Sequence, residues 1–307
     1  MIFFSPDERR LRAGWRLAIH TVLLLVLVFV CELALLVVAG LVANISTWAS
    51  DDAFLLLLNE LGLFLAVTLA TWLVRRFIDR RSFASLGLQI SRQSSYDLLA
   101  GFAISFVMMG SIFAVELMLG WTQMPEFAWQ TQAGISVLGS LALWLFIFIL
   151  GGWAEELLSR GYHLQTLAGG LNLFWGVLIS SAVFGMLHLG NPDASWVSTL
   201  GILLAGLFLA LPYVLTRQLW LSIGLHIGWN FFEGVIFGFP VSGLQTYNLL
   251  QHSVTGPELW TGGAFGPEAG LLLLPALLFG SVLVYLYARP ELRNSLTNKD
   301  SNLAPLD

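Results

Sequence analysis

Two adjacent carboxylates, Glu155 and Glu156, lie with Arg160 at the end of an almost unbroken apolar run from Ile135 to Trp153. An ionisable group at membrane depth costs at least about 2.5 kcal/mol and usually persists only where it is paired or functional. Glu156 precedes Arg160 by four residues, which favours a helical ion pair. Glu155 lies on another face with Ser159 and is left free to act on water or substrate. An ordinary Glu–Arg pair at a helix end is the alternative.

Other polar side chains follow in two later apolar stretches. His188 ends the segment Phe184–His188, and His226 precedes Asn230 by four residues, which places both on one helical face. Glu233 continues that face, and we assign it a supporting role. A single membrane histidine is more often a packing residue than a catalyst. Because unpaired polar groups in hydrocarbon are costly, three helices that each carry such groups indicate a shared site.

Spacing along the chain allows Glu155 and His188 to meet. Their midpoint lies beside Gly169–Gly170, where a helical hairpin would turn. Two antiparallel helices would then place both side chains roughly 22 to 26 Å from the turn, at about 1.5 Å per residue. We therefore expect the fourth helix to continue past Arg160. The tip of the hairpin, about Arg160 to Asn172, is expected to protrude into the cytoplasm.

Composition places these residues in a membrane protein. Hydrophobic residues make up 57% of the chain and charged residues 11%, with a mean hydropathy of +0.80. Soluble domains usually contain about 25% charged residues. The single cysteine, Cys31, excludes an intramolecular disulfide and a cysteine-based metal site. The net charge of -5 gives no nucleic-acid footprint, so no nucleic-acid partner is expected.

Hydropathy predicts an all-α polytopic protein of about eight transmembrane helices that enclose an intramembrane cavity. The expected spans are Leu17–Ala43, Phe54–Val74, Leu98–Leu119, Ile135–Glu156 and beyond, Phe174–His188, Trp196–Leu215, Leu219–Phe239 and Ala269–Ala288. With both termini cytoplasmic, no Lys or Arg falls in an outer loop, as the positive-inside rule requires. The expected location is the plasma or inner membrane.

The chain divides into three predicted regions. Residues 1–97 hold two N-terminal spans and an Arg-rich interfacial linker, and residues 98–290 form a membrane core that contains every motif above. Residues 291–307 form a polar cytoplasmic tail that we expect to be disordered. Segment Pro240–Pro267 is expected to be a loop over the outer mouth of the core.

The remaining polar membrane residues are expected to satisfy one another between helices. They are His20, Glu32, Asn59, Glu60 and Glu116. His163, on the hairpin, is expected to face solvent. None of them enters the predicted site.

Three motifs resemble the signature of the CPBP family. They are EExxxR at Glu155–Arg160, FxxxH at Phe184–His188 and HxxxN at His226–Asn230, in this order and within about residues 135–239. The family comprises type II CAAX prenyl endopeptidases and bacterial Abi-type proteins, often described as intramembrane metalloproteases. Ser159 departs from the pattern, because an aromatic residue often precedes the arginine.

The resemblance implies an intramembrane endopeptidase, of glutamate type or metallo type. By similarity, Glu155 and His188 would activate a water for attack on a peptide carbonyl. His226 and Asn230 would stabilise the oxyanion that results, and both are suitable donors. The expected partners are the lipid bilayer and a peptide or protein substrate, membrane-anchored or lipidated.

The chemistry of the residues leaves the cofactor open. Glu155, His188 and His226 could supply three ligands to Zn²⁺. Asn230 is a poor zinc ligand, and the chain has no HExxH pattern. A metal-free Glu–His pair is physically adequate to activate water, and we favour it over zinc.

Two other functions remain compatible with the sequence. A non-catalytic protein of the same fold, such as a bacteriocin-immunity or scaffold protein, would not need both Glu155 and His188. A proton-coupled transporter would use buried Glu and His residues as a relay. The paired broken-helix repeats typical of many transporters do not occur here.

Overall fold

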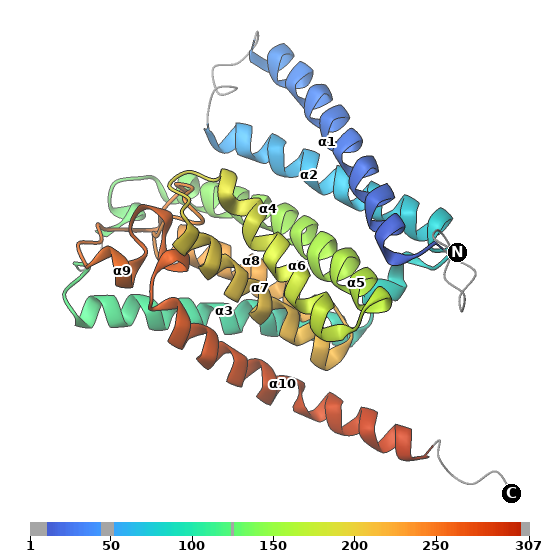
Figure 1. Cartoon of the computed structure of the whole chain (residues 1–307). Coiled ribbons are helices and arrows are strands. Elements are labelled where there is room, and N and C mark those ends of the chain that lie inside the picture. Colours follow the sequence, from blue (N-terminus) through green and yellow to red (C-terminus); the bar gives the residue numbers. More distant parts are fainter. Residues whose placement is uncertain (1–10, 44–51, 124–125, 302–307) are drawn as a thin grey trace, which may run out of the picture.

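The computed structural model describes residues 11–43, 52–123 and 126–301. Its ordered elements are almost all helices, which confirms the predicted all-α class (Figure 1). The two short strands, β1 (Glu126–Phe127) and β2 (Leu250–Gln251), form an antiparallel pair with Glu126 opposite Gln251.

The α-helices of the described residues follow the apolar segments of the sequence. They are α1 (Ala13–Ala43), α2 (Asp52–Leu73), α3 (Arg92–Met118), α4 (Gly134–Glu156), α5 (Leu164–Gly170), α6 (Leu173–Leu187), α7 (Trp196–Thr216), α8 (Trp220–Asn230), α9 (Glu258–Thr261) and α10 (Leu273–Ser301). Three π-helices are η2 (Val74–Ile78), η5 (Leu157–His163) and η7 (Phe231–Ile236). Short 3₁₀ turns are η3 (Phe83–Leu86), η4 (Ala128–Gln130), η6 (His188–Gly190), η8 (Gly263–Phe265) and η9 (Pro267–Ala269).

Six helical segments in the described part of the chain are long and apolar enough to cross a membrane, so the protein is a multi-pass membrane protein. The count of eight spans is not confirmed. The predicted seventh span corresponds to α8, with 11 residues, and η7, with 6. The predicted eighth corresponds to a shorter apolar helix, Leu273–Arg289. Both apolar helices are present, but each is short for a full crossing.

The last helix is longer than the sequence suggested. α10 continues to Ser301, into the stretch that was expected to be a disordered tail. Glu, Leu, Arg and Lys in that stretch are good helix formers, which accounts for the continuation. Residues 302–307 lie outside the described residues.

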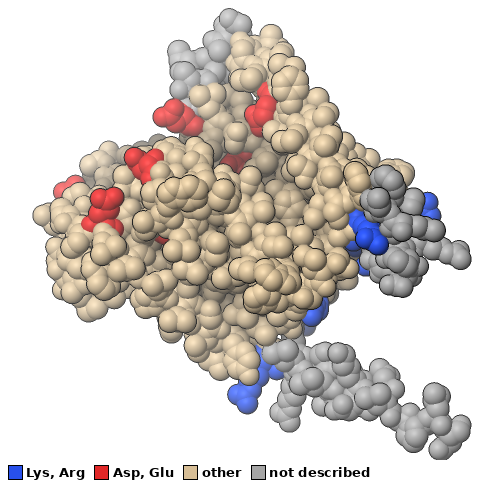
Figure 2. Space-filling view, in the orientation of Figure 1, with Lys and Arg blue, Asp and Glu red and all other residues tan. Residues whose placement is uncertain are grey.

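Charged side chains separate toward opposite ends of the molecule (Figure 2). Lys and Arg lie near the start of α1 and along the lower edge of the view, whereas Asp and Glu lie toward the top and upper left. This separation agrees with the pattern that predicted the positive-inside arrangement. Four basic residues used in that prediction lie outside the residues whose side chains are described: Arg9, Arg10, Arg293 and Lys299.

The predicted helical hairpin is present. α4, η5 and α5 form one continuous helical segment, Gly134–Gly170, so the fourth helix does continue past Arg160. The chain then turns, and the side chain of Asn172 accepts a hydrogen bond from the backbone of Trp175, 3.1 Å away, at the start of α6. This cap reverses the chain direction, and α6 packs against α5 and η5.

The tip of the hairpin is covered by the beginning of α1. A Cβ on Gly170 would meet the Cβ of Ala13, and the ring of His20 stacks on Tyr162 at 4.1 Å. His163 is half-buried and meets His20 edge to face. The expectation that His163 faces solvent is therefore wrong, because α1 packs on this part of the hairpin.

A buried ionic cluster joins the start of α1 to the end of α2. Asp79 accepts one bond from Arg16 and one from Arg75, each of 3.1 Å and each to a different carboxylate oxygen. Arg75 also donates to the hydroxyl of Ser85. We call Arg16, Arg75, Asp79 and Ser85 the Asp79 cluster. It fixes the N-terminal pair of helices at the basic end of the molecule.

Close packing of α3 against α8 places α8 in the centre of the bundle. A Cβ on Gly224 would lie 2.1 Å from the backbone oxygen of Leu98, and one on Gly228 would lie 2.9 Å from the Cα of Phe102. Larger residues at these two positions would separate the helices. The glycines therefore bring α8, with His226 and Asn230, into the core.

Candidate active site

The four predicted catalytic residues line one cavity of about 570 Å³. Glu155 comes from the last turn of α4, His188 from the junction of α6 and η6, and His226 and Asn230 from α8. Residues of α1, α2 and α7 complete the wall. The structure thus brings together side chains that are separated by up to 75 positions in the chain.

The Glu155 carboxylate lies between two imidazoles. Its Oε2 is 3.7 Å from Nε2 of His188 and 3.8 Å from Nε2 of His226. Both distances exceed a direct hydrogen bond, and this buried Oε2 has no hydrogen-bond partner among the described residues. A separation of this kind suits a bridging atom such as a water oxygen.

Backbone geometry orients His188. Its Nδ1 is 2.8 Å from the carbonyl oxygen of Phe184. Because a carbonyl can only accept, Nδ1 carries the hydrogen, and in the neutral ring the lone pair is on Nε2. That lone pair is on the side of Glu155. The FxxxH spacing therefore supplies both the histidine and the carbonyl that selects its tautomer.

Glu156 has a wider role than the ion pair that the sequence suggested. Its Oε1 accepts from Nη1 of Arg160 at 2.7 Å, so the predicted pair is present. The same oxygen accepts from Nδ1 of His226 at 2.8 Å. Arg160 also donates to the backbone oxygen of Gly206 at 2.9 Å and lies over the ring of Phe184. Glu156 therefore connects α4 to α8 and orients His226.

The predicted supporting residue Glu233 does not line the cavity. Its side chain is fully buried in η7, and both its oxygens lack a hydrogen-bond partner within the described residues. The reason is local geometry: the helix changes from α to π directly after Asn230, so a residue three positions on does not return to the same face. The supporting role of Glu233 stays a prediction.

Glu268, from η9, also lines the cavity, and the sequence did not indicate it. Its carboxylate accepts from Nε1 of Trp229 at 3.2 Å and from the hydroxyl of Ser242. Burial raises the pKa of the Glu268 carboxyl, and the Ser242 hydrogen bond opposes that rise. The chain between η7 and α10, which we call the outer segment, thus contributes to the wall of the site. The sequence feature that could have indicated Glu268 is its position as a carboxylate directly before the last predicted apolar span.

Glu60, from α2, is a second residue that lines the cavity but was not predicted to belong to the site. Its Oε2 is buried without a hydrogen-bond partner among the described residues. The expectation that the remaining polar residues satisfy one another is wrong for this residue. It is also wrong for Glu116, whose oxygens both lack a partner within that part of the chain, and for His20, which bonds to Thr71.

Zinc ligation can be tested against the donor set. Glu155, His188 and His226 are of the types that zinc binds, and both histidines donate Nδ1–H to an oxygen, as metal-ligating histidines do. Among the described residues, however, no group of three or more His, Cys, Asp or Glu side chains is arranged to hold a metal ion.

Comparisons with known proteins agree with the motifs. A family model described as "Type II CAAX prenyl endopeptidase Rce1-like" matches residues 137–232, which include all four predicted catalytic residues. A Bacillus subtilis (strain 168) protein named "Putative membrane peptidase YdiL" is 26% identical over 216 residues, which cover 68% of this chain and 83% of that protein. No solved structure matches. Over the matched residues, the chain is therefore similar to membrane peptidases of the type II CAAX prenyl endopeptidase kind.

Proposed function

We propose that the protein is an intramembrane endopeptidase that hydrolyses a peptide bond with a water activated by Glu155 and His188. The observation that carries this proposal is the position of Glu155 Oε2, which is 3.7 Å from His188 and 3.8 Å from His226 and has no hydrogen-bond partner among the described residues. Buried polar groups are normally hydrogen-bonded, so an exception requires an explanation. A bound water and a substrate carbonyl would fill the gap.

In the proposed first step, the water donates one hydrogen to Glu155 Oε2 and the other to the lone pair of His188 Nε2. Its oxygen attacks the carbonyl carbon while Glu155 takes the proton, and the carbonyl π electrons move to oxygen. The tetrahedral intermediate then collapses. The C–N bond breaks, and the proton held by Glu155 passes to the leaving amine, so that one water has been added across the bond.

The oxyanion is stabilised by His226 and Asn230. Glu156 can only accept from Nδ1 of His226, so the ring offers a hydrogen on Nε2 only as an imidazolium. The carboxylates of Glu155 and Glu156 offset that positive charge. Asn230 offers its amide hydrogens from the next turn of α8, on the same cavity wall. Together they form the oxyanion site.

This mechanism uses no metal. Should zinc bind, Glu155, His188 and His226 would hold it, and the ion would supply a more acidic water and a Lewis acid for the carbonyl. The residues of this chain would still orient the substrate as described. The test below separates the two cases.

The test is cleavage of a peptide library by the purified protein in detergent, with products identified by mass spectrometry. Wild type is compared with Glu155→Ala and His188→Ala, with and without chelator. Glu116→Gln is a matched control, because Glu116 is a buried carboxylate that lines neither cavity described here. We expect cleavage by wild type and by the control, and none by the two site variants.

Cleavage that persists in both site variants would overturn the assignment. Activity that survives the chelator supports the metal-free mechanism. Activity that the chelator removes and zinc restores would assign the three residues as zinc ligands. A wild type that cleaves nothing would favour a non-catalytic member of the family.

We further propose a plasma-membrane or inner-membrane location with both termini in the cytoplasm. The separation of basic and acidic side chains in Figure 2 supports this orientation. The proposed substrate is a peptide segment that reaches the cavity from the bilayer, either membrane-anchored or lipidated. Protease protection of tagged termini in inside-out vesicles tests the orientation.

A further inference from the structure

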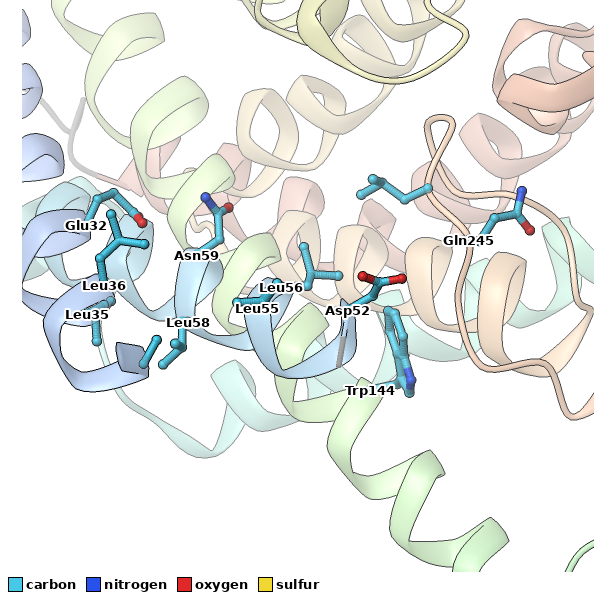
Figure 3. Close-up of a pocket in the computed structure, with 12 residues that line it drawn as sticks. Glu32, Leu35, Leu36, Asp52, Leu55, Leu56, Leu58, Asn59, Trp144 and Gln245 are labelled. Carbon is cyan, nitrogen blue, oxygen red and sulfur yellow. The ribbon is translucent and has the colours of Figure 1, made fainter. Parts of the chain in front are cut away.

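A second cavity adjoins the candidate active site. It has a volume of about 520 Å³ and lies between α1, α2, α4 and the outer segment, where Glu32, Asp52, Asn59, Trp144 and Gln245 line it (Figure 3). The two cavities share three lining residues, Leu56, Asn59 and Leu244. A peptide in the active site therefore has an adjoining space on the acidic side of the molecule.

The lining of both cavities is apolar and acidic. Glu32 and Asp52 line the outer cavity, and Glu60, Glu155 and Glu268 line the inner one. Neither set of lining residues contains a Lys or Arg. Most other lining residues are aliphatic or aromatic, which suits apolar ligand groups.

Of the three carboxylates that line the inner cavity, Glu60 is the one to which neither a catalytic role nor a pair of hydrogen bonds is assigned above. Glu155 has the catalytic role proposed above, and both oxygens of Glu268 accept hydrogen bonds. Oε2 of Glu60 has no partner within the described residues. A Cβ on Gly151 would lie 2.8 Å from that oxygen, so Glu60 reaches α4 one turn before Glu155. Glu60 and Glu155 line the same cavity, and Glu32 lines the adjoining one.

We propose that Glu60 binds the side chain of a lysine or arginine in the substrate, next to the peptide bond that is cleaved. The preferred substrate is then an apolar segment with one basic residue. This inference rests on the proposed endopeptidase function and adds its specificity.

The physical reason is the cost of a buried carboxylate oxygen, Oε2 of Glu60, that has no donor among the described residues. A cationic side chain supplies charged hydrogen-bond donors to Glu60 and leaves the apolar wall in contact with apolar neighbours. A neutral side chain of the same length fills the space but leaves the carboxylate unpaired. Discrimination of this type is strong because the unsuitable ligand leaves a buried polar group unsatisfied.

The experiment uses peptides that differ at a single position near the cleaved bond. This position holds lysine, norleucine or glutamate. The ratio of kcat/KM for lysine over norleucine is measured for wild type, Glu60→Gln and Glu60→Asp. We expect a ratio on the order of tenfold to a hundredfold in wild type, a ratio near one in Glu60→Gln, and partial recovery in Glu60→Asp. The glutamate peptide should be the poorest substrate of wild type.

The matched control is again Glu116→Gln, which removes a buried carboxylate elsewhere and should keep the wild-type ratio. A wild-type ratio near one, or a ratio unchanged in Glu60→Gln, would overturn the inference.

A binding measurement covers the case in which a variant does not fold or no peptide is cleaved. Reduced-bond analogues of the lysine and norleucine peptides, which cannot be hydrolysed, are titrated against wild type in detergent. Tighter binding of the lysine analogue supports the inference, and equal binding overturns it. Binding without cleavage would instead count against the proposed function alone.

Discussion

Two carboxylates in this protein differ in how completely their buried oxygens are bonded. In the Asp79 cluster, each oxygen of Asp79 accepts from a different arginine at 3.1 Å. In the candidate site, Oε2 of Glu155 is also buried but has no hydrogen-bond partner among the described residues. Its nearest imidazole nitrogens are 3.7 and 3.8 Å away.

The contrast separates a structural ionic group from one arranged for chemistry. Asp79 lacks no donor, so a ligand would have to displace an arginine to reach it. Glu155 is held near two histidines but can still receive a proton. An incompletely bonded group lowers the stability of the folded protein, and active sites commonly accept that cost.

The largest effect should follow from Glu155→Gln. The substitution keeps the shape and removes the proton acceptor, so we expect the cleavage rate to fall by about 10²- to 10⁴-fold. The midpoint of thermal unfolding in detergent, followed by tryptophan fluorescence, should not decrease, because a buried unpaired charge is lost. A lower midpoint would show that Glu155 is bonded like Asp79.

The substitution Asp79→Asn should have the opposite profile. It leaves two buried arginines without their counter-charge, and the free energy of unfolding should fall by about 3 to 5 kcal/mol. The cleavage rate per folded molecule should stay at the wild-type value. The control is Asp193→Asn, because Asp193 is exposed and has a φ of 54° that Asn adopts readily. A selective loss of rate in Asp79→Asn would contradict the structural role.

The substitution Glu156→Gln should combine both effects at smaller size. Glu156 pairs with Arg160, as Asp79 pairs with its arginines, and it also orients His226. We expect the rate to fall by about 10- to 100-fold, as for residues that orient catalytic or metal-binding histidines. The unfolding midpoint should also decrease. If only the cleavage rate fell, Glu156 would act in the reaction alone. If only the unfolding midpoint fell, its role would be structural alone.

Much of the fold could be predicted because it depends on local patterns. Apolar runs specified where the helices lie, and the Gly169–Gly170 pair with Asn172 marked the hairpin turn. The tail was less predictable, because after Pro290 helix-forming residues alternate with polar ones, and polarity alone is typical of disorder. The half-buried state of His163 depends on α1, more than a hundred positions away in the chain, and no local pattern indicates that contact.

In the candidate site, too, the parts set by local patterns could be predicted and the parts set by contacts between distant elements could not. The motifs predicted Glu155, His188, His226 and Asn230 as one group, because each motif is a helical spacing that repeats a polar face. The bond from His226 to Glu156 joins two helices, and Glu60 and Glu268 enter from elements outside the motifs. The position of Glu233 outside the cavity lining could not be predicted, because a sequence that starts as an α-helix gives no sign of where it widens to a π-helix.

Two of the three π-helices named above begin directly after motif residues, η5 after Glu156 and η7 after Asn230. A π turn contains an additional residue compared with an α turn. Deleting one residue from η5 could restore α geometry there and turn the following part of the hairpin about the helix axis. Glu155, on the N-terminal side, would keep its place. Insertions and deletions in these two segments are therefore a means by which related chains can vary what faces the cavity while the reacting groups stay fixed.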